Sequence, residues 1–535
     1  MANKNRPFHI TIDYEKNQGA LNPIWRSFGY DEINWTYTPR GKKLFQQIGA
    51  LSSGSYYIRC HHTFTSGNKL SSPSFGSGDV YHLDQNGQAR FDFSTLDQIF
   101  DTMLQNNCKP IVELGFMPAS LSSGPKPKVT YDYSSNDLHK YPPKDYKQWE
   151  QLIFETISHL VKRYGEKEVC SWYFELWNEP DFQGFFKGTI KDYCKMYDYA
   201  VAGATRALPS VKIGGPALAG KPKFLKQFLK HCSVGKNHAT HEKGTRLNFI
   251  SFHAKGTGWP SVGEPFTMPS LKAILGYLEN CLGMMQKFPQ YKNLPLLLDE
   301  CDMAVGTNFG VYDFPEYDFH NNEYYPVFLI RMAKYILDFI ASKKIAINFF
   351  TTWAFYYEGK RFFEGNRALI TNENIRKPVF NAFTLLEMLG QNRLKFKIGS
   401  SDKNHSHNYP QIDGLAATKK DGSLQVVIWN FDETNSLTGK NKIQLTIKNI
   451  PPHCQTMSIS RYQIDSKNSN SFFKWNELGA PQNPTIEQIN EIKKNQGLKL
   501  IEKKKSITPA SGIISFEIEL PLQSVCLLNF LPETD

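Results

Sequence analysis

Short apolar segments alternate with longer amphipathic segments from residue 22 to about residue 385. The longer segments, such as 95–107 and 149–165, place apolar residues three and four positions apart, which is the period of an α-helix with one buried face. The short segments are interpreted as strands, because they are brief, apolar and bounded by turn-forming residues. In chain order they are 23–29, 56–61, 110–116, 172–179, 211–217, 248–255, 295–300 and 347–355.

Eight strand-and-helix units in succession predict a parallel α/β architecture. Eight units close into a (β/α)8 TIM barrel, which we place at residues 22–388. A doubly wound open sheet is the alternative. It calls for a glycine-rich phosphate-binding turn after an early strand, and the sequence has none.

The pattern changes after residue 388, where short β-rich segments are separated by Gly, Asn, Asp and Pro. This pattern predicts an accessory C-terminal antiparallel β-sandwich over residues 389–535. One helical segment, 485–496, interrupts it. The N-terminal residues 1–21 contain a further strand, FHITIDY, which we expect to join the same sandwich.

Composition adds a preference for anionic partners. The chain has 535 residues and a formal net charge of +11, which favours nucleic acid or an acidic polysaccharide by long-range attraction. No nucleic-acid motif accompanies the charge, so we predict no nucleic-acid partner. Aromatic residues make up 14% of the chain, which suits either a large packed core or stacking against sugar rings.

The cysteines and the apolar segments restrict the classes of protein and the cellular compartments that fit the sequence. The nine cysteines form no CxxC pair, which argues against a metal or redox site, and their odd, scattered distribution suits a reducing compartment. No run of 18 apolar residues exists, so we predict no membrane contact. The N-terminus is polar. We therefore expect a cytoplasmic protein, or one exported without a cleavable signal peptide.

Two carboxylates stand at strand ends, where (β/α)8 enzymes carry their chemistry. Glu179 ends the fourth strand in FELWNEPDF, and Glu300 ends the seventh in LPLLLDECDM. Glycoside hydrolysis needs such a pair, one carboxyl donating a proton and the other attacking the sugar. Pro180 biases Glu179 away from α-helical geometry. Asn178 is placed to bind a sugar hydroxyl beside the reacting carbon.

Strand alternation assigns the neighbours of Glu300 to the opposite face. Asp299 and Cys301 flank Glu300 on its strand, so both are predicted to face the helix layer. His253 and Lys255 lie two residues apart on the sixth strand and should share one face. Because two carboxylates suffice for the reaction, we predict no cofactor and no metal.

These motifs resemble glycoside hydrolase family 39, the β-xylosidases and α-L-iduronidases of the retaining clan A. The resemblance covers nearly the whole chain. The segments that carry it are LNPIWRSFGYDE, YYIRCH, FELWNEPDF, VKIGGPA, RLNFISFHAKG, LPLLLDE and ISRYQIDSKNSNSFFKW. It implies that Glu179 is the general acid/base and that Glu300 is the nucleophile.

The resemblance also implies substrate-binding residues. Arg59 and His61 match an RxH element on the second strand. Arg59 either keeps Glu300 ionised or forms an ion pair with Glu175, and His61 either contacts a sugar hydroxyl or is a buried structural histidine. Lys255, in FHAKG, resembles the lysine that binds the uronic acid in the iduronidase branch.

Two further positions match this branch more loosely. Arg367, in NRALIT, lies where the iduronidase branch has an arginine that binds the substrate carboxylate. Glu358 follows the last strand, at the place of an aspartate that holds sugar hydroxyls. For both, the alternative is an ordinary polar rim.

We therefore predict a retaining glycosidase that cleaves the terminal bond of an oligo- or polysaccharide, either a β-xyloside or an α-L-iduronide or related uronide. The alternative is a non-catalytic carbohydrate-binding protein on the same barrel, because fold alone does not establish catalysis.

Overall fold

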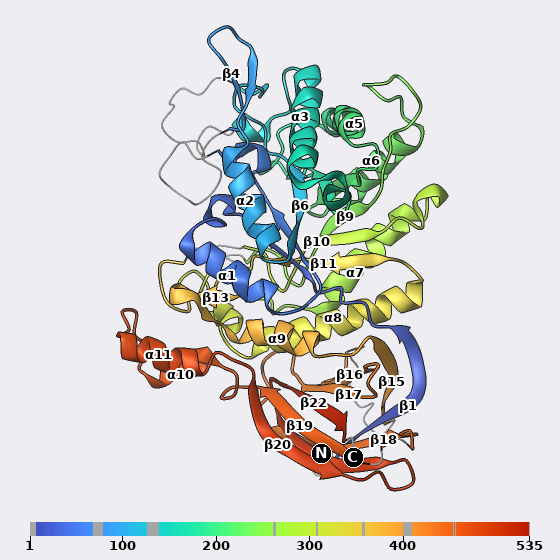
Figure 1. Ribbon diagram of the computed structural model, residues 1–535, viewed down its shortest axis with the longest axis vertical. Helices are drawn as coiled ribbons and strands as arrows, with labels where there is room; N and C mark the ends of the chain where they lie inside the picture. Colours follow the sequence, from blue (N-terminus) through green and yellow to red (C-terminus); the bar gives the residue numbers. More distant parts are fainter. Residues whose placement is uncertain are drawn as a thin grey trace.

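The computed structural model describes residues 7–67, 79–125, 138–260, 264–306, 309–355, 359–399, 409–452, 454 and 456–533. Its described strands form two nine-stranded sheets and two short hairpin sheets (Figure 1). The first large sheet is wholly parallel and runs in the order β11-β10-β9-β8-β7-β6-β3-β2-β12. Its strands are β2 (Ser27–Tyr30), β3 (Tyr56–Cys60), β6 (Cys108–Leu114), β7 (Tyr173–Leu176), β8 (Ile213–Leu218), β9 (Ile250–Lys255), β10 (Leu296–Asp302), β11 (Ile347–Phe350) and β12 (Thr352–Trp353).

The last predicted strand closes this sheet into a ring. Residues 347–355 form two pieces, β11 and β12, separated at Thr351. β11 pairs with β10, and β12 pairs with β2 at the other end of the sheet. The two ends of the strand order are thus joined by one segment, as a barrel requires and an open sheet does not. The predicted (β/α)8 barrel is confirmed.

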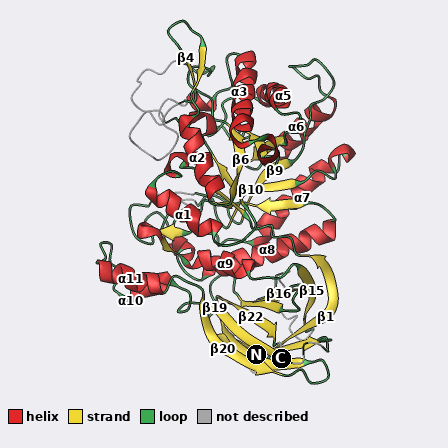
Figure 2. Ribbon diagram, in the orientation of Figure 1, coloured by secondary structure: helices red, strands yellow, loops and turns green. Residues whose placement is uncertain are grey.

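Helices surround the ring (Figure 2). Their first turns carry the capping residues that satisfy free backbone amides: Asp145 accepts from two amides at the start of α3, and Thr189 forms a capping box with Asp192 at α5. The helices that follow the strands are α1 (Pro39–Gly49), α2 (Ser94–Gln105), α3 (Tyr146–Tyr164), α4 (Glu166–Val169), α5 (Ile190–Ala207), α6 (Pro222–Val234), α7 (Leu271–Met285), α8 (Tyr324–Lys343) and α9 (Pro378–Glu387).

The barrel interior is filled in layers of opposite character. The lower layer is apolar and consists of Tyr57, Ile111, Tyr173, Phe249, Leu297 and Phe349. The next layer is charged, with Arg59, Glu113, Glu175 and Asp299 fully buried. The apolar layer closes the bottom of the barrel, so polar groups converge only toward the carboxyl ends of the strands.

The second large sheet runs in the order β20-β19-β22-β17-β16-β15-β1-β18-β21 and is antiparallel except between β1 and β18. Its inward-facing Ile, Leu and Val side chains form a core of their own. The predicted accessory β-domain is confirmed. The strands are β1 (Phe8–Ala20), β15 (Asn392–Ile398), β16 (Ile412–Thr418), β17 (Leu424–Asn430), β18 (Lys440–Lys448), β19 (Met457–Ile464), β20 (Lys499–Ile507), β21 (Ile514–Pro521) and β22 (Ser524–Pro532).

Two helices interrupt this sheet between β19 and β20. They are α10 (Ser471–Glu477) and α11 (Ile486–Lys494), and they project from the sheet below α1 (Figure 1). Trp475 of α10 and Ile492 of α11 pack against Phe362, Phe363 and Ile375 of the barrel. The insertion therefore connects the accessory domain to the β12–α9 loop of the barrel through an apolar contact. Within the described residues, every helix is too short or too polar to cross a bilayer.

The short hairpins lie in connections of the barrel. They are formed by β4 (Tyr81–Leu83) with β5 (Ala89–Phe91), and by β13 (Ile370–Thr371) with β14 (Ile375–Arg376). The second hairpin belongs to the loop that connects β12 to α9, which also carries Arg367.

Candidate active site

Glu179 lies three residues beyond β7, at the carboxyl end of the barrel. Its φ is 45°, and that of Trp177 is 67°, so both lie in the left-handed region. Such geometry costs a non-glycine residue roughly 1–2 kcal/mol, and it persists where the surroundings fix it. Here the Glu179 amide donates to the Ala217 carbonyl at 2.9 Å, which ties the turn to β8. The turn holds the carboxylate at the barrel mouth.

A β-bulge in β10 sets the position of Glu300. Leu297 pairs with Ser251 and Glu300 with His253, so two residues of β10 oppose one residue of β9. Asp299 therefore faces the interior beside Glu300, with Oδ2 3.5 Å from both Arg59 Nη2 and His253 Nε2. The prediction that Asp299 faces the helix layer is wrong, because the bulge breaks the alternation.

Past the bulge, alternation resumes. Cys301 is buried, and its Sγ lies 3.6 Å from Met332 Sδ of α8. It faces the helices, as predicted. Asp302, the next residue, turns back toward the mouth of the barrel.

His253 stands between the two candidate catalytic carboxylates. Its Nδ1 lies 2.8 Å from Glu179 Oε1 and 3.6 Å from Glu300 Oε2. One oxygen of each carboxylate and a ring nitrogen of His253 all lie within 4.8 Å of one another. Burial lowers the pKa of His253, but the carboxylates of Glu300 and Asp299 outweigh burial and raise this pKa to about 10. The imidazole is therefore a cation at neutral pH.

Glu300 is an ionised carboxylate despite its burial. Desolvation raises its pKa, but His253, Lys255, Arg59 and His61 together hold that pKa far below its usual value. The contacts are 2.8 Å from Lys255 Nζ to Oε2 and 3.3 Å from Arg59 Nη1 to Oε1. A buried anion surrounded in this way is poised to act as a nucleophile rather than as an acid.

Arg59 makes both of the contacts considered from the sequence, one with Glu300 and one with Glu175. Its Nε donates to Glu175 Oε2 at 2.6 Å, while Nη1 reaches Glu300 and Nη2 donates to Asn178 Oδ1 at 3.0 Å. Asn178 is fully buried, and its Nδ2 has no hydrogen-bond partner among the described residues. The amide is thus oriented by Arg59 and keeps a free donor.

His61 is held by Glu113, whose Oε2 lies 2.5 Å from Nδ1. Its Nε2 is 3.4 Å from Asp31 and 3.7 Å from Glu300. Burial lowers the pKa of His61, but Glu113 and Asp31 reverse this effect and raise it. Asp31 also accepts from Trp353 Nε1 at 3.2 Å. Sequence reasoning missed Asp31, although its place directly after β2 was a signal that could have found it.

Lys255 and Arg367 meet at a third carboxylate, Asp302. Arg367 Nη1 donates to Asp302 Oδ2 at 2.7 Å, and Lys255 Nζ forms a close ion pair with the same oxygen. Both cations line the cavity at the barrel mouth. Sequence reasoning missed Asp302, although strand alternation from Glu300 places it on the same face two residues later, which was a signal that could have found it.

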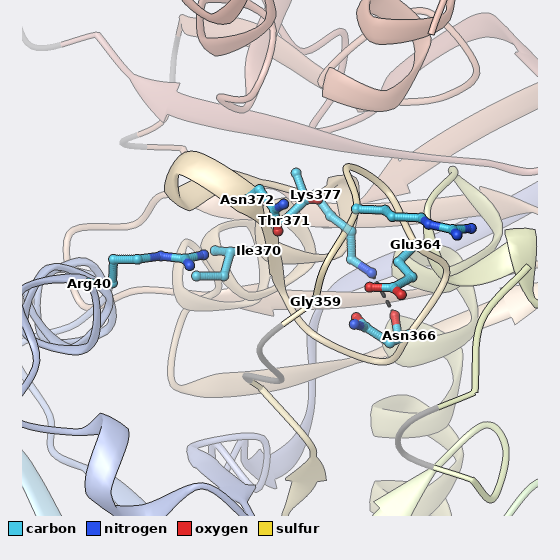
Figure 3. Close-up of a pocket in the computed structure, with 9 residues that line it drawn as sticks. Arg40, Gly359, Glu364, Asn366, Ile370, Thr371, Asn372 and Lys377 are labelled. Atoms are coloured by element: carbon cyan, nitrogen blue, oxygen red, sulfur yellow. Dashed lines mark hydrogen bonds between the residues drawn. The ribbon is translucent and has the colours of Figure 1, made fainter. Parts of the chain in front are cut away.

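Lys377 holds the loop that carries Arg367 in place. Lys377 Nζ donates to the Asn366 carbonyl at 2.6 Å, and Figure 3 shows Lys377, Asn366 and Glu364 pointing toward one another. The Lys377 side chain is fully buried, and this burial lowers its pKa to about 7. Arg367 is therefore fixed on both sides, by Asp302 and through Asn366. The remaining sequence candidate, Glu358, lies outside the described residues.

The cavity at the barrel mouth encloses about 1120 Å³. Glu179, Glu300, Lys255 and Arg367 all line it, together with His61, Asp31 and Trp353. Phe182 and Trp259, whose side chains are exposed, line it as well. Sites for small molecules usually enclose about 300–1,000 Å³, so this cavity has room for more than one sugar ring.

Among the described residues, two groups of three side chains bring potential metal-ligand atoms close together. One is Glu179, His253 and Glu300, and the other is Asp198, His231 and His238. In the second group, both histidines donate to the Asp198 carboxylate, which also accepts from Thr245 Oγ1. Its polar atoms thus satisfy one another.

The chain is similar in sequence to known glycosidases. A β-xylosidase of Caldicellulosiruptor saccharolyticus is 28% identical over 505 residues, covering 92% of each chain. An α-L-iduronidase of Mus musculus is 24% identical over 571 residues, covering 99% of this chain and 82% of its own.

Two solved structures share the fold. The bacterial orthologue of human α-L-iduronidase has a TM-score of 0.80 at 22% identity, covering 99% of this chain and 84% of its own. The monomeric β-xylosidase of Caulobacter crescentus CB15 has a TM-score of 0.77 at 19% identity, covering 98% and 100%. The family model for glycosyl hydrolases family 39 matches residues 8–513. The chain belongs to glycosyl hydrolases family 39 and is a glycoside hydrolase.

Proposed function

We propose that the protein is a retaining glycosidase in which Glu300 is the nucleophile and Glu179 the general acid/base. The observation that carries this proposal is the distance of at most 4.8 Å between a carboxylate oxygen of Glu179 and one of Glu300. Retaining enzymes hold their two carboxyl groups about 5–5.5 Å apart, whereas inverting enzymes leave about 6.5–9.5 Å for a water molecule.

The reaction proceeds in two steps. Glu300 forms a bond to the anomeric carbon while the bond to the glycosidic oxygen breaks, and that oxygen takes the proton of Glu179. Water then attacks the same carbon, the bond to Glu300 breaks, and Glu179 takes the proton from the water. Asn178 donates through its free Nδ2 to a hydroxyl beside the reacting carbon, and Arg59 fixes the orientation of this amide.

We further propose that the sugar is a uronic acid, such as an α-L-iduronide. Lys255, which is partly buried, and Arg367, which is buried, both line the cavity and share one protein carboxylate, Asp302. Asp302 is the carboxylate between these two cations, and Lys255 also contacts Glu300 at 2.8 Å. A substrate carboxylate would give Arg367 and Lys255 a further anionic partner, which a neutral xyloside would not supply.

The test measures which substrate is hydrolysed and how the loss of the proposed nucleophile changes its turnover. Wild-type protein is assayed with an aryl α-L-iduronide and an aryl β-xyloside, and Glu300→Ala is assayed on the better substrate with and without azide. We expect turnover of the iduronide, loss of turnover in Glu300→Ala, and recovery with azide as a glycosyl azide. Glu316→Ala, an exposed carboxylate, is the control for the substitution. Equal turnover by Glu300→Ala and wild type would refute the nucleophile assignment.

A further inference from the structure

A second groove lies on the outside of the barrel, away from the mouth. It encloses about 570 Å³ and shares no lining residue with the cavity that contains Glu179 and Glu300. The contributing elements are α1, the loop before α9, α9 itself and the end of α11, so both the barrel and the accessory domain form its walls. Figure 1 shows α11 projecting from the accessory sheet on the side of α1 and α9. Its lining residues are Lys43, Gln46, Gln47, Ala50, Leu51, Asn374, Arg376, Phe380, Thr384, Lys493 and Gln496.

The charges in this groove are all of one sign. Lys43, Arg376 and Lys493 line it, and no acidic residue does. Within the described part of the chain, none of these three cations forms an ion pair. Their neighbours differ in this respect: Lys494, on the same helix as Lys493, pairs with Glu491 at 2.5 Å.

Arg376 is the unusual member of this set. Its Nε is buried and has no hydrogen-bond partner among the described residues, and its guanidinium carbon lies 5.1 Å from the centre of the Phe380 ring. Burial lowers the pKa of Arg376. Burial of a cation without an anionic partner is costly, so an anion in the groove would stabilise Arg376.

We propose that the groove is a second, non-catalytic site for a short acidic saccharide. The cations match carboxylate or sulfate groups. The side-chain amides of Gln46 and Gln47 match sugar hydroxyls, whereas those of Asn374 and Gln496 already bond Arg40 and the Arg376 backbone amide. The volume lies within the usual range for small-molecule sites. The choice of a saccharide rests on the proposed function. A nucleic acid is disfavoured because Phe380, the single aromatic residue that lines the groove, is buried and offers no face for a base.

The experiment measures binding without turnover. A heparin-derived tetrasaccharide is titrated by calorimetry into protein carrying Glu300→Ala, and then into the same protein with Arg376→Gln and Lys493→Gln added. We expect the two groove substitutions to weaken one class of site by about tenfold or more, since each removes a charge-assisted contact to the anion. The matched control carries Lys42→Gln and Lys494→Gln, which remove the same charge from exposed residues that do not line the groove.

Equal binding by the groove variant and the matched control would overturn the proposal. So would equally tight binding of neutral xylotetraose, or binding of sodium sulfate as tight as that of the tetrasaccharide, which would indicate a simple anion site. A circular dichroism melt confirms that each variant is folded. Because the binding is measured in a catalytically disabled background, failure of the proposed uronidase activity does not affect this result.

Discussion

At the scale of single residues, the candidate site is a network of charges in which each group fixes the state of the next. Glu300 is ionised because Lys255, Arg59 and the protonated His253 surround it, and His253 is protonated because two carboxylates lie beside it. The sequence placed Glu179 and Glu300 at the carboxyl ends of two barrel strands, and the structure brings both to one cavity. The sequence could not identify Asp302 as the partner of Lys255 and Arg367, because that contact joins the ends of two strands and one loop in space.

Lys255 provides the residue-scale prediction. Lys255→Met removes one cation of the Lys255–Arg367–Asp302 group. We therefore expect the loss of kcat/KM relative to wild type to be about tenfold or more larger for an aryl α-L-iduronide than for an aryl β-xyloside. Both values will fall, because Lys255 also contacts Glu300. The ratio isolates the substrate carboxylate. A parallel fall for both substrates would show that Lys255 serves Glu300 alone.

At the scale of elements, the main departure from sequence reasoning is the bulge in β10. Strict alternation would place Asp299 and Glu300 on opposite faces, but the extra residue directs both inward. Alternation was a sound guide for His253 and Lys255, because β9 is regular there. Bulges change the direction of side chains, and they leave no clear pattern in a single sequence.

The loop between β12 and α9 gives the element-scale prediction. The pKa of Lys377 is lowered to about 7 in the folded protein, against 10.5 for its ordinary value. Between these pH values the unfolded chain binds a proton that the folded protein does not, so this group makes stability rise with pH. We expect the free energy of unfolding of wild type to increase, relative to that of Lys377→Met, from pH 7 to pH 10. Denaturant titrations across this range measure it, with Lys360→Met as the exposed control. A constant difference between wild type and Lys377→Met would contradict a buried, largely neutral Lys377.

At the scale of the whole molecule, the barrel and the accessory sheet are joined by the α10–α11 insertion. The sequence predicted the barrel, the accessory domain and a helix at 485–496. It did not predict that the insertion packs on the loop that carries Arg367. That contact depends on Phe363 and Trp475, whose rings lie 5.1 Å apart and whose positions are 112 residues apart in the chain (475 minus 363).

Trp475 tests this connection. Trp475 is 7% exposed, and Trp475→Ala should cost about 3–5 kcal/mol of stability through the cavity it creates. Ile486→Ala on α11, where the side chain is 73% exposed, should change stability by no more than about 0.5 kcal/mol. Thermal unfolding of both variants checks the difference, and indistinguishable melting curves would mean that the insertion does not hold the two parts together.

The placement of β1 has a consequence for how the polypeptide is built. Phe8–Ala20 is an interior strand of the accessory sheet, hydrogen-bonded to β15 on one side and β18 on the other. Synthesis releases this segment before the barrel, and its two neighbours only after the barrel has left the ribosome. β1 must therefore wait, unpaired, until β15 and β18 emerge. A fragment beginning at residue 389 would have a gap in the middle of its sheet, so the accessory domain cannot be excised by a single cut.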